Sequence, residues 1–138
     1  MREIWIWAEV WGDRIEDVSL EIAGKASEMG EVSLILMGYG LEKSAEEASR
    51  HADGVYLMED ESFRFYDPLL FSENLARLAI ERKPDAILFG ATAIGRDIAA
   101  RTSAKLGTGV VSHVIDLKLE GEKITGEVPG WGETSPSQ

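Results

Sequence analysis

The chain has 138 residues, 25 of them acidic and 14 basic. Its net charge of −11 argues against a nucleic-acid partner, because phosphate attracts Lys and Arg and repels carboxylates. It contains no cysteine, which excludes disulfide bonds and thiol chemistry. With 44% hydrophobic and 28% charged residues, a chain of this length is expected to fold as one globular domain.

The N-terminal segment has the pattern of neither a signal peptide nor a membrane anchor. It lacks a positively charged start followed by a long apolar stretch, because Glu9 interrupts the apolar run 4–8. No segment approaches the ~20 apolar residues of a membrane helix. We therefore expect a cytoplasmic protein without a membrane partner.

The run 4–8 is almost continuously apolar, which predicts a first strand that is covered on both faces. Trp5 and Trp7 stand two positions apart in it. They are expected to pack on the same buried face, although tryptophans could also supply a stacking surface or a redox relay.

A helix is predicted next, with more than one possible start. Asp13 and Glu16 have the spacing of a capping box, and Asp17 or Ser19 could equally begin the helix. Gly30 stands where a C-terminal cap is expected. The helix is predicted from apolar residues that recur at spacings of three and four: Ile15, Val18, Ile22, Ala26 and Met29.

The middle of the chain continues the alternation of strands and helices. Strands are predicted over 32–37 and 55–58, with a short helix over 41–52 between them. Asp67-Pro68 predicts the start of a third helix, since proline lacks only a donor that is unpaired at that position. Pro84 ends this helix.

The C-terminal part adds two more strands and a hairpin. Residues 86–89 form the most apolar strand, and an apolar row over 94–106 predicts the helix that follows it. A fifth strand is predicted over 110–119, with a turn at 120–122 and a return strand over 123–128.

This order of elements predicts the fold class. We expect an α/β domain over residues 1–128, with a doubly wound, mostly parallel five-stranded sheet in a Rossmann-like three-layer sandwich and a C-terminal β-hairpin. A barrel would need eight strand–helix units. Residues 129–138 are rich in Gly, Ser and Pro and are expected to form a flexible tail or the start of a linker.

Three loops follow strand ends, where open parallel sheets bind ligands near the reversal of strand order. They are 8–12, 37–40 and 90–97, and the last has the most polar and small residues. Its small residues allow a backbone to approach closely, and the helix that it opens offers unpaired N–H groups to an anion.

The residues of the 90–97 loop have two interpretations. Thr92 could donate a hydroxyl and Arg96 a planar fork to a phosphate or carboxylate. Alternatively, Gly90 and Gly95 only ease a tight turn, Thr92 caps the helix and Arg96 pairs with Asp97.

The sequence gives little support for metal binding or catalysis. His51 and His113 are the only histidines, and without cysteine they do not make a metal site. The acidic run 59–61 is interpreted as a solvated loop. No dinucleotide fingerprint, phosphate-binding lysine loop, nucleophile elbow or zinc-protease motif occurs, and no nucleophile stands with its base. We therefore predict that the chain has no catalytic residues and is not an enzyme.

The stretch 84–101 closely resembles the N-terminal domain of the electron-transfer flavoprotein α subunit. That family shows a Pro-Asp strand and then Gly-Ala-Thr-x-x-Gly-Arg-Asp, and here the strand is followed by Gly90-Ala91-Thr92 and Gly95-Arg96-Asp97. The segment 106–109 and the pair Ala8-Glu9 are also similar to the family. The resemblance runs in order from residue 3 to about residue 132.

The sequence departs from the family pattern in two places. Ser112-His113 stands where the family has Ser-Asp. In the family's later Pro-x-aromatic-Gly-Gly motif, which corresponds to residues 129–133, Glu133 replaces the second glycine. The resemblance also implies that the family's FAD is held chiefly by a second, C-terminal domain outside these residues. The chain is then either a fragment or a stand-alone relative that lacks the flavin half.

The resemblance implies an adenine-nucleotide-α-hydrolase-like fold, flavin-based electron transfer and association with a β-like subunit, which in the family keeps a bound AMP. FAD is implied for the complete assembly, without tight binding by this chain, and AMP is a possible ligand. The alternative is a stand-alone adenine-nucleotide-binding or regulatory module. Either ligand would be expected at seven residues: Ala8, Glu9, Gly90, Thr92, Gly95, Arg96 and Asp97.

An association surface is expected to expose aromatic side chains. Trp11 and Tyr39 stand in loops, and Trp131 lies in the Gly-rich tail, although each could fold back onto its own domain. Without a partner, such a surface could join two copies as a homodimer.

Overall fold

Five parallel strands form the sheet at the centre of the computed structural model, which describes residues 2–107 and 109–117. Their order is β5-β4-β1-β6-β7. After β1, the chain adds β4 and β5 on one side of this strand and then β6 and β7 on its other side, so the order of strands reverses between β1 and β6. The strands are β1 (Glu3–Trp7), β4 (Glu31–Gly38), β5 (Gly54–Glu59), β6 (Ala86–Gly90) and β7 (Val111–Ile115).

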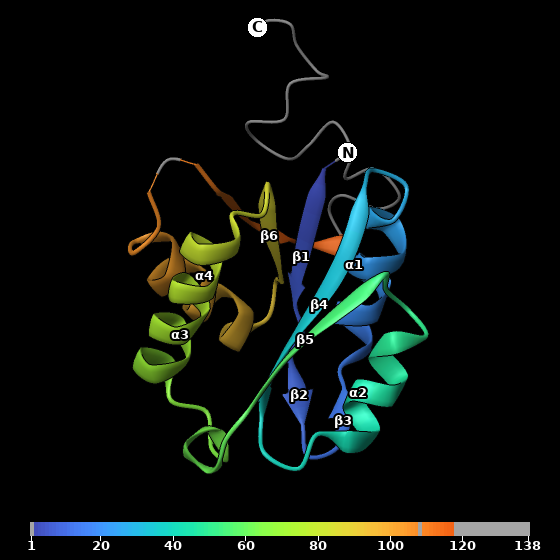
Figure 1. Cartoon of the computed structure of the whole chain (residues 1–138), viewed down its shortest axis with the longest axis vertical. Coiled ribbons are helices and arrows are strands. Elements are labelled where there is room, and N and C mark those ends of the chain that lie inside the picture. The colour runs from blue at the N-terminus through green and yellow to red at the C-terminus, as the bar shows by residue number, and fades with distance from the viewer. Residues whose placement is uncertain (1, 108, 118–138) are drawn as a thin grey trace, which may run out of the picture.

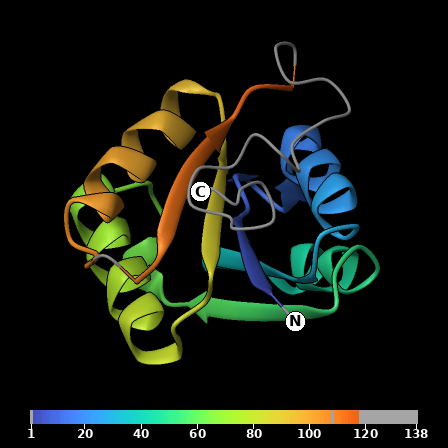
Figure 2. The same ribbon diagram turned by 90° about the horizontal axis from the view of Figure 1, so that it is seen from above.

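Helices cover both faces of this sheet (Figures 1 and 2). One face packs against α1 (Asp17–Ala26) and α2 (Glu42–Ser49), and the other against α3 (Pro68–Arg82) and α4 (Ala93–Ser103). The predicted doubly wound, three-layer α/β fold with five strands is confirmed, and within the described residues this sheet is entirely parallel. The fifth strand, predicted over 110–119, covers Val111–Ile115, and the predicted turn at 120–122 and return strand over 123–128 lie outside the described residues.

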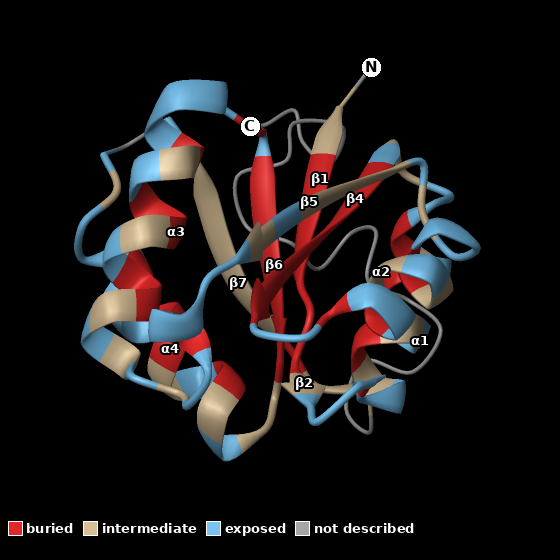
Figure 3. Ribbon diagram, turned by 60° about the horizontal axis from the view of Figure 1, so that its bottom comes forward, coloured by how far each residue is buried: buried red, intermediate tan, exposed pale blue. Residues whose placement is uncertain are grey.

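The alternation of side chains along β1 divides the core into two layers. Ile4 and Ile6 pack toward α1 and α2, whereas Trp5 and Trp7 pack toward α3 and α4. All four side chains are buried, as Figure 3 shows for the central strands. The expected shared face of the two tryptophans is confirmed, because successive residues of a strand point to opposite faces.

α1 begins at Asp17, which is one of the three starts that the sequence allowed. A small antiparallel hairpin of β2 (Val10–Trp11) and β3 (Arg14–Ile15) precedes the helix. Gly12 sits in its turn at a φ of 63°, which glycine adopts without a steric penalty. Asp13 therefore belongs to a β-turn, and the capping box that begins there is wrong.

The start and end of α3 agree with the sequence. The Asp67 carboxylate accepts hydrogen bonds from the backbone N–H groups of Leu69 and Leu70, and Pro68 occupies the first turn. The helix ends at Arg82, and Lys83 then takes a left-handed conformation ahead of Pro84. Short polar caps and proline act through local geometry, which explains why the sequence predicts these bounds.

The two layers of helices differ in charge. Residues 1–60, which include α1 and α2, contain 14 acidic and 5 basic residues. Residues 61–117, which include α3 and α4, contain 7 of each. Most of the negative charge of the described chain is therefore carried by its first half.

Candidate functional site

The carboxyl ends of β1 and β6 meet where the strand order reverses, and they bring two predicted loops together. Thr92, after β6, donates a hydrogen bond from Oγ1 to Glu9 Oε1, after β1, at 2.6 Å. Ala8, the residue between β1 and Glu9, is buried in the core. The structure thus joins residues 83 positions apart that the sequence had placed at one site.

The Thr92 hydroxyl is also the N-cap of α4. Its Oγ1 accepts a hydrogen bond from the Gly95 N–H at 2.9 Å while its own proton goes to Glu9. A Cβ added to Gly95 would lie 2.0 Å from the Gly90 carbonyl oxygen. Capping by Thr92 and a tight turn at the two glycines, one of the two interpretations of this loop, are therefore present.

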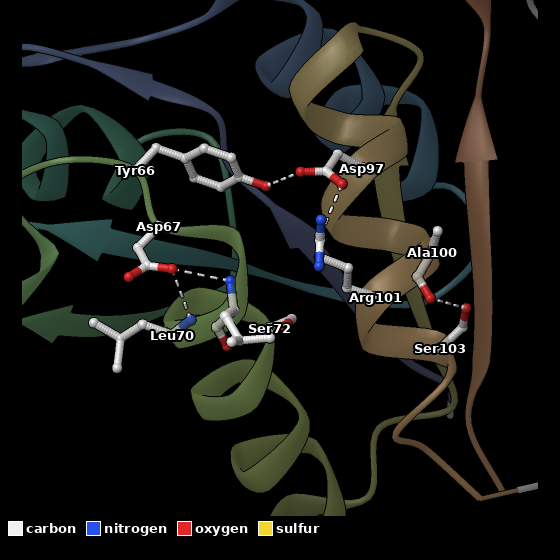
Figure 4. A network of polar contacts seen from close by, with 9 residues as sticks. Tyr66, Asp67, Leu70, Ser72, Asp97, Ala100, Arg101 and Ser103 are labelled. Carbon is white, nitrogen blue, oxygen red and sulfur yellow. Dashed lines mark hydrogen bonds and ion pairs between the residues drawn. The ribbon is translucent and has the colours of Figure 1, made fainter.

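Arg96 and Asp97 do not pair with each other. Arg96 is mostly exposed and its Nη2 lies 4.0 Å from Asp116 Oδ2, whereas Asp97 accepts hydrogen bonds from Tyr66 Oη at 3.0 Å and Arg101 Nε at 2.9 Å (Figure 4). The Arg96–Asp97 pair expected in one interpretation is therefore wrong. In a helix, residues four apart lie on the same face and neighbouring residues do not, so Asp97 reaches Arg101.

Tyr66 links the loop before α3 to α4. Its ring packs edge-on against Phe71, with centroids 5.2 Å apart, and its hydroxyl reaches Asp97. Burial and the hydrogen bond to the Asp97 carboxylate raise the pKa of Tyr66 well above its usual range. The hydroxyl therefore stays protonated and donates to Asp97.

Glu9 is the most enclosed acidic group of the site, with 7% of its surface exposed. Its carboxylate accepts hydrogen bonds from Thr92 Oγ1 and from Trp11 Nε1, the latter at 3.0 Å, and both donors are neutral. Its backbone N–H donates to Ser19 Oγ at 3.0 Å. Within residues 2–107 and 109–117, Glu9 forms no ion pair.

A cavity of about 280 Å³ opens beside Glu9, at the carboxyl ends of β1 and β4. Its inner wall includes Trp7 and Met37, which are buried, and its outer rim includes exposed aromatic rings. The Trp7 Nε1 atom is buried without a hydrogen-bond partner among the described residues. The aromatic residues of the lining are Trp7, Trp11, Tyr39, Phe63, Phe65, Tyr66 and Phe71.

The sequence predicted part of this cavity. Trp11 and Tyr39 are 55% and 51% exposed, as expected, although Trp11 belongs to β2 and not to a loop. Trp131 lies outside the described residues. The segment 63–66 was missed, although three of its four residues are aromatic. It has no strand or helix period, so its composition was the only available signal.

Of the seven predicted site residues, only Glu9 lines this cavity, and the other six do not. No group of three or more potential metal ligands occurs in the part of the chain that the structure describes. None of the described helices combines the length and the apolar character that crossing a membrane requires.

Comparisons with known proteins give one consistent result. The family described as "Electron transfer flavoprotein domain" matches residues 4–134. The electron transfer flavoprotein subunit alpha of Clostridium acetobutylicum is 31% identical over 94% of this chain and 41% of its own length. That of Thermoanaerobacterium thermosaccharolyticum is 32% identical over 86% of this chain and 38% of its own length.

A protein with a different name belongs to the same group of relatives. The acryloyl-CoA reductase electron transfer subunit beta of Anaerotignum propionicum is 30% identical over 88% of this chain. The match covers 35% of that relative's length. The chain thus spans well under half the length of these three curated relatives.

Proposed function

The chain belongs to the electron transfer flavoprotein family, and we propose that it acts in the cytoplasm as an α-subunit-like domain, part of an electron carrier rather than an enzyme. The observation that carries the proposal is the family match over residues 4–134, together with relatives named as α subunits that align with 86–94% of the chain. The α/β fold agrees with this assignment but does not by itself specify a function.

The domain works, in this proposal, by associating with a β-like subunit. The exposed Trp11 and Tyr39 support a protein contact, because aromatic residues are enriched at interfaces. Sedimentation across a concentration series, with and without a β-like subunit, tests this. We expect a heterodimer when both are present and, without the partner, at most a weak homodimer. A strict monomer that ignores the β-like subunit contradicts the proposal.

The second part of the proposal concerns the flavin. FAD serves the complete family assembly in this proposal, and residues 1–138 do not hold it tightly, because they contain no dinucleotide-binding fingerprint. Titration of FAD into the purified chain, followed by flavin fluorescence, should show no stoichiometric quenching in the micromolar range. Stoichiometric binding would place the flavin site in this domain and overturn this part.

The alternative function, an adenine-nucleotide-binding module, has one structural feature in its favour. The N-terminus of α4 lies at the reversal point of the sheet, and Arg96 in its first turn is exposed. If AMP binds there, Arg96→Ala should weaken binding by at least about tenfold, since a charge-assisted hydrogen bond is lost. The exposed Arg77 of α3 supplies the matched control, and Arg77→Ala should leave AMP binding unchanged.

A further inference from the structure

Glu9 carries a buried negative charge that the described residues do not neutralise. A carboxylate that is more than nine-tenths buried ordinarily stands beside a cation, because two neutral hydrogen bonds replace only part of its hydration. Thr92 and Trp11 each supply one neutral donor. Each carboxylate oxygen has a second lone pair, so Glu9 retains capacity for a positively charged partner.

The cavity beside Glu9 has the walls that attract such a partner. Aromatic ring faces carry a negative potential, and an organic cation within about 6 Å of a ring centroid is stabilised by it. Seven aromatic residues and Glu9 contribute to this lining. At the rim, Trp11, Tyr39 and Phe65 are more than half exposed and accessible.

One cation of the chain already uses this surface. The guanidinium carbon of Arg64 lies 5.0 Å from the centroid of the Tyr39 ring, and Arg64 also pairs with Glu61 at 3.3 Å. Arg64 lines the cavity but forms no ion pair with Glu9. Its position shows that the ring of Tyr39 accommodates a positive group.

We propose that this cavity binds a small organic cation, an alkylammonium or guanidinium group, with Glu9 as the counter-ion and the surrounding rings as the cage. The excess of 14 acidic over 5 basic residues in segment 1–60 adds a negative field that favours a cation over an anion. The site shares Trp11 and Tyr39 with the proposed partner contact, but cation binding can be tested on the chain alone.

The size of the cavity limits the ligand. A volume of about 280 Å³ lies just below the usual range of small-molecule pockets, about 300–1,000 Å³. It suits a compact head group. The two sources of such a group are a free alkylammonium compound and the arginine side chain of a protein, which share the same chemistry at the site.

Matched probes separate charge from shape. Choline and its neutral isostere 3,3-dimethylbutan-1-ol should be titrated into the full chain, with N-acetyl-arginine amide as the model of a protein side chain. Tryptophan fluorescence and amide NMR shifts report binding near Trp7 and Trp11. We expect one of the two cations to bind saturably and at least about tenfold more tightly than the neutral isostere. The tighter of the two identifies the source.

Two variants with opposite expected effects keep the test decisive. Glu9→Gln keeps hydrogen-bonding capacity but removes the charge and should weaken cation binding by at least about tenfold. Arg64→Gln removes a like charge from the rim and should strengthen binding severalfold, and this exposed residue does not threaten folding. The proposal is overturned if neither cation binds, if the neutral isostere binds equally well, or if Arg64→Gln weakens binding.

Discussion

The Gly90–Asp97 turn and the aromatic cavity lie beside each other at the same edge of the sheet, yet their polar groups are satisfied to different degrees. In the turn, Thr92 uses both its proton and its oxygen within the chain. Beside the cavity, Trp7 Nε1 is buried and has no partner among the described residues, and Glu9 forms no ion pair with them. The turn contains the glycine motif, but more of the polar groups beside the cavity lack a partner within the described residues.

A glycine motif at a strand end can therefore serve the folding of the chain and not ligand binding. Gly95 lets α4 pack directly on the end of β6, because a Cβ there would lie 2.0 Å from the Gly90 carbonyl oxygen, whereas a Cβ at Gly90 would meet the Val18 side chain of α1 at 3.2 Å. The cavity is formed by residues from four separate segments, and no short motif describes it. Substitutions at this edge should therefore affect folding at the turn and ligand binding at the cavity.

The largest expected effect is at Gly95. Gly95→Ala would place a Cβ 2.0 Å from a backbone oxygen, which cannot move aside as a flexible side chain can. We expect the free energy of unfolding to fall by about 3 kcal/mol in urea denaturation.

Gly24, in the last turn of α1, supplies the control for this experiment. A Cβ there meets nothing within 4 Å, so Gly24→Ala should raise the free energy of unfolding by about 0.5–1 kcal/mol through helix propensity. Equal effects of the two substitutions would show that Gly95 is not needed for close packing.

The second effect is at Thr92. Thr92→Val keeps the shape but removes the cap of α4 and the hydrogen bond to the buried Glu9, and should lower the free energy of unfolding by about 2 kcal/mol. Thr102 is a matched control in the same helix, since its buried Oγ1 has no hydrogen-bond partner among the described residues. Thr102→Val should leave stability unchanged or raise it, and a loss as large as that of Thr92→Val would contradict this account.

The sequence predicted the turn far better than the cavity, for a physical reason. Asp67 and Thr92 are N-caps, and a cap satisfies N–H groups two or three residues away, so its signal is local. The order of strands and helices was readable for the same reason, because each element has its own apolar period.

The missed features depend on residues that are far apart or on very short elements. The Tyr66–Asp97 hydrogen bond spans 31 positions, and the hairpin of β2 and β3 has only two residues in each strand. Neither leaves a periodic pattern. Phe63 ends the 3-10 helix η1 (Glu61–Phe63) and Phe65 stands two residues later, yet Phe63 is buried and Phe65 is 79% exposed, a distinction that only the packing of this segment decides.

The third effect is at Tyr66, whose hydrogen bond to Asp97 joins the cavity wall to α4 and whose contribution to stability depends on pH. Tyr66→Phe removes the hydrogen bond to Asp97 and should lower the free energy of unfolding by about 1 kcal/mol at pH 7. Because the pKa of Tyr66 is raised in the folded state, its contribution is complete below the usual tyrosine pKa of about 10 and is lost as the pH rises above it.

The difference between the native chain and Tyr66→Phe should therefore shrink above about pH 10, as measured by urea denaturation at several pH values. Tyr39→Phe is the control, because the Tyr39 ring is half exposed at the cavity rim and no hydrogen bond of its hydroxyl is found within the described residues. It should leave stability unchanged at pH 7. A constant difference at all pH values would mean that the pKa of Tyr66 is not raised in the folded state.

The smallest expected effect on stability is at Arg64, at the cavity rim. Its contacts with the Tyr39 ring and with Glu61 are both solvent-exposed, and each is worth less than about 1 kcal/mol. Arg64→Gln should lower the free energy of unfolding by about 0.5 kcal/mol at low salt, and the loss should diminish at high salt. Since cation binding should strengthen in the same variant, stability and affinity would move in opposite directions. A large loss of stability would instead show that Arg64 supports the fold of the rim, and the cavity would then resemble the turn.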